Sequence, residues 1–284
     1  MSIRVVGIVY QADRDEAEQL SAQAVALLKP RGVEVRHFRR DIEDGHLCES
    51  APELDLVITL GGDGTIVRTA RLLSQAEVPV LGVNLGRLGF LAEVEPERLE
   101  EGLQQVLDGR YHVEERMMLH ARVMREGHEI ASYEAVNDCV VSRGAVSRTI
   151  RVELDVDGHY VMTRTSDAEI VSTPTGSTAY CLAAGGPIIA PDVDCFAVTP
   201  VAAHLSVAHA IAVSARRCLC LHLVKGDAAT MTADGQQDVL LEVGDRVLCT
   251  ASERKARFVR FGADGYFYET VLRRLRWPDL GPIP

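Results

Sequence analysis

The sequence Leu54-Asp55-Leu56-Val57-Ile58-Thr59-Leu60-Gly61-Gly62-Asp63-Gly64-Thr65 runs from a mainly apolar stretch into a glycine-rich turn. Residues 54–60 have the composition of a buried strand. Beyond the turn, residues 65–74 place apolar side chains at helical spacing, at Ile66, Val67, Ala70 and Leu73. A strand, a tight turn and a helix in this order are typical of an α/β domain with a parallel sheet.

The segments around this stretch continue the alternation of strands and helices. Residues 3–9, 33–38 and 78–84 are short apolar runs that predict further strands. Residues 15–28 and 96–107 carry apolar side chains at helical spacing. Because strands and helices take turns, the crossovers should be right-handed and the sheet parallel. We therefore predict a Rossmann-like α/β domain over residues 1–110.

The pattern changes at about residue 111, where short alternating strands begin to dominate. Turn-forming dipeptides punctuate them at Asp157-Gly158, Asp234-Gly235 and Gly244-Asp245. Residues 151–156 and 159–163 should form the two arms of one hairpin. We predict an all-β sandwich domain over residues 111–262. A helical pattern returns at residues 265–277, so we expect the segment 263–284 to complete the first domain.

The composition limits the partners of the chain. Its 284 residues contain 41 acidic and 30 basic side chains, which give a formal charge of −11. This excess argues against broad electrostatic binding of nucleic acid or of an anionic membrane. An anionic ligand must then be held locally, by backbone amides, a helix N-terminus, a few basic side chains or a metal ion.

The cysteines and the hydropathy suggest a cytoplasmic protein. The seven cysteines show neither zinc-site spacing nor a redox CxxC pair, which indicates free thiols in a reducing compartment. No apolar run reaches the length of a membrane span. The first ten residues predict a strand rather than a signal peptide.

The glycine turn has the features of a phosphate site. A helix N-terminus beyond a parallel strand offers unpaired N–H groups and a partial positive charge, and glycines let the backbone approach a phosphate closely. The carboxylate of Asp63 in such a turn would accept a proton from an attacking hydroxyl or hold a divalent cation. The alternative is that Asp63 only caps the following helix. The turn is neither a Walker loop nor a GxGxxG motif.

A second polar segment follows more than a hundred residues later. Ser172-Thr173-Pro174-Thr175-Gly176-Ser177-Thr178-Ala179-Tyr180 contains five hydroxyl-bearing Ser and Thr residues and leads to Gly185-Gly186-Pro187. So many short donors would suit hydrogen bonds to ribose, amide or phosphate oxygens. The alternative is an ordinary turn rich in serine and threonine.

Together with Asn137-Asp138 and Asp234-Gly235-Gln236, these two segments resemble the NAD kinase family, whose members phosphorylate the adenosine 2′-hydroxyl of NAD to give NADP. The glycine turn is shared with lipid kinases and loosely with phosphofructokinases, whereas the hydroxyl-rich run is highly specific. The resemblance implies an N-terminal α/β domain and a C-terminal β-sandwich domain. It also implies that NAD binds in the cleft between them, partly across the interface of a homodimer or homotetramer.

The resemblance further assigns roles to residues. It places the proton acceptor at Asp63, the hydroxyl-binding pair at Asn137 and Asp138, and the contact with the nicotinamide end at Asp167. Other NAD contacts fall on Gly64, Arg148, Thr165, Thr175, Thr178, Ala179, Tyr180, Cys181, Leu182, Ala183 and Gln236. The phosphate-donor loop comprises Gly61, Gly62, Gly64, Thr65 and Arg68. The alternative for Arg68 is a solvated position on the helix face.

Two positions depart from the family pattern. Asp167-Ala168-Glu169 stands where Asp-Gly-Leu is expected, and His209-Ala210 stands where Arg-Pro is common. Neither departure removes a residue that is assigned to the chemistry.

The expected reaction is an in-line transfer from ATP or polyphosphate to NAD. A divalent cation, Mg²⁺ by preference, should arrive with the phosphate donor, because no cluster of Asp, Glu and His has metal-ligand spacing. No tightly bound organic cofactor is expected. Two alternatives remain at this stage: a lipid kinase with the same glycine turn, and a non-catalytic NAD sensor.

Overall fold

The computed structural model describes residues 3–11, 14–40, 44–86, 89–144, 149–204, 209–226, 228–262 and 266–275. The chain forms two compact units. The first comprises Met1–Glu115 and Ala256–Pro284, and the second comprises Arg116–Lys255. The sequence predicted the corresponding boundaries at residues 110 and 262, just outside two long strands, whereas the boundaries of the units fall within these strands. These strands, β5 (His112–Arg125) and β16 (Arg246–Arg260), carry the chain from one unit into the other.

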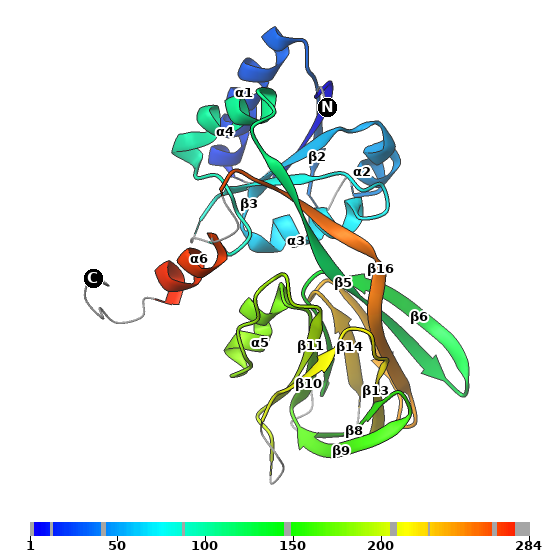
Figure 1. The fold of residues 1–284 in the computed structure, drawn as a ribbon. Helices are drawn as coiled ribbons and strands as arrows, with labels where there is room; N and C mark the ends of the chain where they lie inside the picture. Colours follow the sequence, from blue (N-terminus) through cyan, green and yellow to red (C-terminus); the bar gives the residue numbers. More distant parts are fainter. Residues whose placement is uncertain are drawn as a thin grey trace, which may run out of the picture. The chain divides into compact units, whose positions relative to one another are not determined.

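The first unit contains a parallel sheet in the order β2–β1–β3–β4–β16 (Figure 1). Its strands are β1 (Val5–Tyr10), β2 (Glu34–Arg39), β3 (Leu56–Gly61), β4 (Val80–Asn84) and the end of β16, where Phe258 lies opposite Val80. The predicted strands in this unit are confirmed. β3 and β4 are buried along their whole length, because helices cover both faces of a parallel sheet.

Helices pack on both faces of this sheet. The helices α1 (Asp15–Leu28) and α4 (Leu99–Leu107) share one hydrophobic core with β1, β3 and β4. On the opposite face α3 (Asp63–Leu73) packs against β3 and β4, with Ile66 directly over Gly82. The unit also contains α2 (Asp44–Ser50) and α6 (Tyr266–Leu275). Three short 3₁₀ turns, Lys29–Arg31, Ala51–Glu53 and Pro96–Arg98, flank longer elements.

The second unit is a sandwich of two antiparallel sheets, as predicted. One sheet has the order β12–β11–β10–β7–β14–β15, and the other contains β9–β8–β13–β16 together with β5 and β6. One hydrophobic core, with Phe196, Val141 and Met231 from the first sheet and Leu154, Leu221 and Val247 from the second, fills the space between them. The remaining bounds are β6 (His128–Ala135), β7 (Asp138–Ser142), β8 (Ile150–Val156), β9 (His159–Ser166), β10 (Ala168–Ser172), β11 (Cys195–Val201), β12 (Ile211–Ser214), β13 (Leu219–Lys225), β14 (Ala229–Ala233), β15 (Gln237–Leu241) and α5 (Tyr180–Ala183).

The predicted hairpin between β8 and β9 is present. Asp157 and Gly158 adopt φ angles of 51° and 77°, the left-handed conformation that a two-residue hairpin turn requires. Asp234 and Gly235 adopt similar angles, 51° and 63°, between β14 and β15. This second turn carries one of the predicted ligand contacts.

Two features of the helices differ from the sequence prediction. The helix expected from residue 65 begins two residues earlier, at Asp63, and α2 was not predicted at all. The last predicted helix is present as α6, although residues 276 and 277 lie outside the described residues. Within the described residues, none of the helices has both the length and the apolarity needed to cross a membrane.

Candidate active site

The glycine turn lies at the point where the strand order of the parallel sheet reverses. The chain passes from β1 to β2 on one side of β1 and returns to β3 on its other side. In open parallel sheets, ligands bind beyond the carboxyl ends of the strands at such a point. Residues 61–65 follow β3 there and lead into α3. The topology of the first unit therefore puts the predicted phosphate loop where a ligand site is expected.

Asp63 does not cap α3; it is the first residue of this helix. Gly62 occupies the capping position with extended backbone angles, φ −87° and ψ −179°, and no side chain caps the helix. The Asp63 carboxylate instead accepts hydrogen bonds from the backbone N–H of Phe90, at 2.6 Å to Oδ2, and of Leu91, at 3.2 Å to Oδ1. The capping alternative is therefore wrong, and the carboxylate is held in a fixed orientation at the helix N-terminus.

Two glycines make this arrangement sterically possible. A Cβ atom on Gly89 would lie 1.7 Å from Oδ1 of Asp63, so the carboxylate occupies the space of the missing side chain. A Cβ atom on Gly61 would lie 2.6 Å from Oγ1 of Thr65. Thr65 is buried, and its hydroxyl accepts a hydrogen bond of 3.0 Å from Nη1 of Arg40. The turn is thus packed tightly from both sides.

Basic side chains follow the carboxyl ends of β1 and β2. Arg14 donates from Nη1 to the carbonyl oxygen of Leu85 at 2.8 Å, and Arg40 contacts Thr65. The predicted donor-loop residue Arg68 forms an ion pair with Asp44 of α2, with Nε 2.9 Å from Oδ2. Arg14 and Arg40 were not predicted from the sequence, although each comes shortly after a predicted strand.

In the second unit, a cavity of about 460 Å³ joins three of the predicted motifs. Its lining includes Asn137 and Asp138 before and at the start of β7, Ala179 and Tyr180 of the hydroxyl-rich segment, and the turn at Asp234. The Asp234 carboxylate accepts backbone N–H groups from Asn137, at 2.7 Å, and from Val136, at 2.9 Å. Asp234 therefore fixes the backbone of the Asn137-Asp138 pair.

Asp138 is an unusual carboxyl group in this cavity. Only 5% of the residue is exposed, and burial together with the negative charge of Asp234 raises its pKa to about 7. The charged and neutral forms are then close in free energy near neutral pH. A protonated carboxyl group donates as well as accepts hydrogen bonds, so Asp138 can pair with a hydroxyl group in either sense.

The hydroxyls of the hydroxyl-rich segment bond mainly to backbone groups. Thr173 donates to the carbonyl oxygen of Val136 at 2.6 Å, and Ser177 donates to that of Pro174 at 2.6 Å and accepts from the N–H of Ile189 at 3.0 Å. Gly176 lies so close to Asn137 that a Cβ atom would be 2.1 Å from its carbonyl oxygen. These buried hydroxyls shape the loop around Asn137 and leave Ala179 and Tyr180 at the cavity.

Further members of the segment flank Ala179 and Tyr180 in the chain. The hydroxyl of Thr178 donates to the carbonyl oxygen of Thr175 at 3.1 Å. Thr175 is buried, and its own hydroxyl accepts a hydrogen bond from Nη1 of Arg116 at 3.2 Å. Cys181 is buried, with its sulfur 3.3 Å from Oγ1 of Thr199, while Leu182 and Ala183 continue α5. Burial raises the pKa of the Cys181 thiol, which therefore stays protonated at neutral pH.

Comparison with known proteins decides the family. The model of the ATP-NAD kinase N-terminal domain matches residues 6–111, and that of the ATP-NAD kinase C-terminal domain matches residues 136–261. The NAD kinase of Syntrophotalea carbinolica is 39% identical over 282 residues, which cover 96% of this chain and 99% of the relative. The NAD kinase of Geobacter metallireducens is 41% identical over 246 residues, which cover 86% of this chain and 87% of the relative. The chain belongs to the NAD kinase family.

Solved structures agree with this membership. An NAD kinase from Archaeoglobus fulgidus in complex with ATP is 27% identical, with a TM-score of 0.76 over 93% of this chain and 96% of that chain. Yeast NADH kinase complexed with NADH gives a TM-score of 0.86 and covers 100% of this chain and 91% of that chain. Because the two sequences are only 22% identical, this likeness concerns the fold alone. The lipid kinase and the NAD sensor gain no support from these matches.

Other positions assigned from the NAD kinase family do not line this cavity or lie outside the described residues. Asp167 is about one-third exposed and pairs with Arg143, at 3.2 Å between Oδ1 and Nε. The carbonyl oxygen of Thr165 accepts the N–H of His204 at 2.8 Å. Arg148 falls outside the described residues. Gln236 completes the turn after Asp234, with its N–H 3.0 Å from the carbonyl oxygen of Ala233.

The two departures from the NAD kinase pattern are linked through one arginine. Glu169 and Arg164 form an ion pair of 2.9 Å in which both side chains are 3% exposed. Arg164 also donates from Nη2 to the carbonyl oxygen of His209 at 3.3 Å. Burial raises the pKa of Glu169, and Arg164 and Ser166 offset part of this effect. The unusual glutamate therefore has a structural partner, and that partner also contacts the backbone of the second unusual position.

Among the residues that the structure describes, no group of three or more His, Cys, Asp or Glu side chains is arranged to hold a metal ion.

Proposed function

We propose that this NAD kinase family member transfers a phosphoryl group to the 2′-hydroxyl of the adenosine ribose of NAD and so produces NADP. The observation that carries the proposal is the Asp63 carboxylate, held by two backbone amides at the N-terminus of α3. A general base must be oriented toward its proton as well as present. In this chain, the family and the fixed carboxylate point to the same reaction.

The first unit is assigned to the phosphate donor and to proton transfer. The N-terminal end of α3, which begins at Asp63, suits the oxygens of a phosphate chain, since a helix N-terminus stabilises anions. ATP is the preferred donor in this proposal, because the related archaeal enzyme was solved with ATP, and polyphosphate is the alternative. A divalent cation, preferably Mg²⁺, would accompany the donor and supply positive charge beside its phosphates. Arg68, oriented by Asp44, would steady the donor.

The second unit is assigned to NAD recognition. The cavity at Asn137, Asp138, Ala179 and Tyr180 offers an amide, a carboxyl group and an aromatic side chain, which suit a ribose and its base. Asn137 and Asp138 bind ribose hydroxyls in this proposal. The remaining contacts are those that the family resemblance implies, at Gly64, Arg148, Thr165, Asp167, Thr175, Thr178, Cys181, Leu182, Ala183 and Gln236.

The transfer itself is an in-line displacement. Asp63 accepts the proton of the 2′-hydroxyl while the ribose oxygen bonds to the terminal phosphorus and the bond from this phosphorus to the leaving oxygen breaks. Each oxygen of a carboxylate has more than one acceptor site, so the bonds from Phe90 and Leu91 leave Asp63 able to take this proton. We also propose that the enzyme is a cytoplasmic homo-oligomer, as the family resemblance implies.

The test is a direct assay of NADP formation. Purified protein is incubated with NAD, MgCl₂ and either ATP or polyphosphate, and NADP is followed with an NADP-specific dehydrogenase. We expect NADP in the ATP reaction and none when NAD or the donor is omitted. Absence of NADP with both donors would contradict the proposal. A parallel reaction in which diacylglycerol micelles replace NAD should yield no phosphorylated lipid.

A further inference from the structure

Arg260, at the end of β16, is a buried arginine with three hydrogen-bond acceptors in the first unit. It is 1% exposed. Its Nη1 donates to the carbonyl oxygen of Leu91 at 2.8 Å and to Oε2 of Glu93 at 3.1 Å, while Nε donates to Oε2 of Glu114 at 2.8 Å. The guanidinium is therefore fixed from two directions and has little freedom to move.

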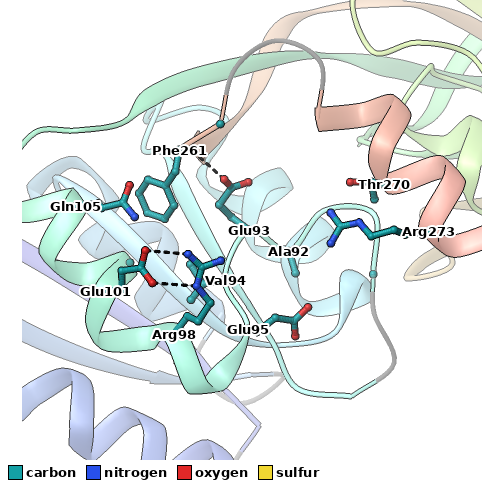
Figure 2. Close-up of a pocket in the computed structure, with 13 residues that line it drawn as sticks. Ala92, Glu93, Val94, Glu95, Arg98, Glu101, Gln105, Phe261, Thr270 and Arg273 are labelled. Atoms are coloured by element: carbon teal, nitrogen blue, oxygen red, sulfur yellow. Dashed lines mark hydrogen bonds and ion pairs between the residues drawn. The ribbon is translucent and has the colours of Figure 1, made fainter. Parts of the chain in front are cut away.

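The acceptors of Arg260 are themselves held in place. Glu93 receives the backbone N–H of Phe261 at 2.8 Å, a bond that Figure 2 shows beside a cavity of about 340 Å³ that Gly89 also lines. Glu114 receives the hydroxyl of Tyr266 at 2.9 Å, and the ring of Tyr266 lies 4.8 Å from the guanidinium carbon. Burial lowers the pKa of Arg260, but Tyr266, Glu114 and Glu93 raise it by more, so that the side chain stays charged.

Leu91 connects this cluster to the proposed proton acceptor. Its N–H donates to Oδ1 of Asp63, and its carbonyl oxygen accepts from Arg260. The same loop is attached to β4, because the N–H groups of Glu93 and Val94 donate to the carbonyl oxygen of Gly82 at 3.0 and 3.1 Å. The segment that orients Asp63 is thus anchored at β4 and, through Arg260, at β16.

We propose that Arg260 is a positioning residue for catalysis: it fixes the Leu91 carbonyl and thereby holds the amides of Phe90 and Leu91 against the Asp63 carboxylate. The inference rests on the proposed function, in which Asp63 accepts the proton. A buried ion cluster alone gives little stability over an apolar replacement, because desolvation offsets the attraction between its charges. A bond from the buried charge to the loop that holds Asp63 provides a functional reason for the cluster.

The test compares Arg260→Lys with the control variant Arg257→Lys. Lysine keeps the charge beside Glu93 and Glu114 but concentrates its donors at one nitrogen, so it cannot hold Leu91 and Glu114 in the same geometry. We expect kcat to fall about ten- to a hundredfold, because small misplacements of reacting groups have effects of this size, with KM for NAD within about twofold. Arg257→Lys makes the same exchange on the same strand, at an arginine that pairs with Glu77 and Glu115, and we expect its kcat to stay within about twofold of wild type.

Two outcomes would overturn the proposal: a near-normal kcat in Arg260→Lys, or an equal loss of kcat in both variants. Thermal melts check that each variant is folded. If Arg260→Lys does not fold, hydrogen exchange of the wild-type protein tests the proposal in its place. The amides of Phe90 and Leu91 should then exchange as slowly as those of β16, and exchange as fast as in an exposed loop would overturn the proposal. A wild type without NADP formation would contradict the proposed function, whereas hydrogen exchange still tests the anchoring.

Discussion

The two aspartates of the proposed site, Asp63 and Asp138, lie in different environments. At the glycine turn, Asp63 is partly exposed, and its carboxylate accepts two backbone N–H groups. At the cavity of the second unit, Asp138 is almost fully buried beside Asp234, and its pKa rises to about 7. Backbone donors fix the direction of a carboxylate, whereas burial beside a like charge changes its protonation. The first environment suits a proton acceptor, and the second suits recognition of hydroxyl groups.

The largest effect should come from Asp63→Asn. The amide side chain has nearly the same shape but cannot accept the proton, so we expect kcat to fall about 10²–10⁴-fold. The dissociation constant for NAD, measured by calorimetry, should change little. Asp108→Asn, at an exposed carboxylate after α4, serves as the control. A variant at position 63 that keeps near-normal turnover would show that the base lies elsewhere.

The next effect should come from Gly89→Ala, which tests the position of the carboxylate while leaving Asp63 in place. The added methyl group would overlap Oδ1 of Asp63, so the carboxylate or the loop must move. We expect kcat to fall about a hundredfold at nearly constant KM for NAD. Gly45→Ala in α2 is the matched control, because its Cβ meets no atom within 4 Å. Equal activity of the two variants would show that the close contact has no role in catalysis.

Asp138→Asn tests the raised pKa of the buried aspartate, through the free energy of unfolding of the protein without ligand. The carboxyl group loses its proton near pH 4 in the unfolded chain and near pH 7 in the folded protein. The folded state therefore binds the proton more tightly, and the contribution of Asp138 to the free energy of unfolding falls as the pH rises through this window. Asparagine does not titrate. Between pH 5 and pH 8 the wild type should lose on the order of 3 kcal/mol relative to the variant.

Urea unfolding at pH 5, 6, 7 and 8 measures this difference, with each variant compared with the wild type at the same pH. Asp108→Asn again serves as the control, and its difference from the wild type should be independent of pH in this range. Parallel curves for Asp138→Asn and the wild type would contradict the shifted pKa.

The smallest effect should come from Ser177→Ala, which removes one hydroxyl from the loop around Asn137. The change leaves the carbonyl of Pro174 and the N–H of Ile189 without this buried partner. We expect a loss of about 1–3 kcal/mol in the free energy of unfolding and a severalfold increase in KM for NAD. Ser132→Ala, at an exposed serine of β6, should change stability by no more than about 0.5 kcal/mol. Equal stability of both variants would show that the internal bonds of Ser177 contribute little.

The sequence predicted the elements of the first unit well because their patterns are local. The strand before the glycine turn is apolar throughout, and residues 15–28 follow one helical period, so both elements appear where they were expected. The exception is α2. Leu47 is the only buried residue that this helix contributes, and Gly45 interrupts its sequence, so residues 44–50 contain no helical period to detect.

The sequence indicated candidate site residues but not the groups that hold them in place. Phe90 and Leu91 lie 27 and 28 residues after Asp63, and no periodicity links a loop to a carboxylate at that distance. Asp234, which acts on Asp138, is nearly a hundred residues farther along the chain. The hydroxyl-rich run indicated dense hydrogen bonding, but whether its donors turn toward a ligand or toward the backbone depends on the folded loop. Tertiary contacts decide these features.

The origin of the fifth parallel strand has a consequence for biosynthesis. The edge of β4 is covered near Val80 by Phe258, which the ribosome adds only after all of Arg116–Lys255 has been made. Synthesis proceeds at about 5–20 residues per second, so the edge of β4 stays unpaired for on the order of ten seconds. During this time Glu93 and Glu114 lack their partner Arg260. We expect this interval to be the period in which the growing polypeptide is most exposed to chaperones and to misassociation.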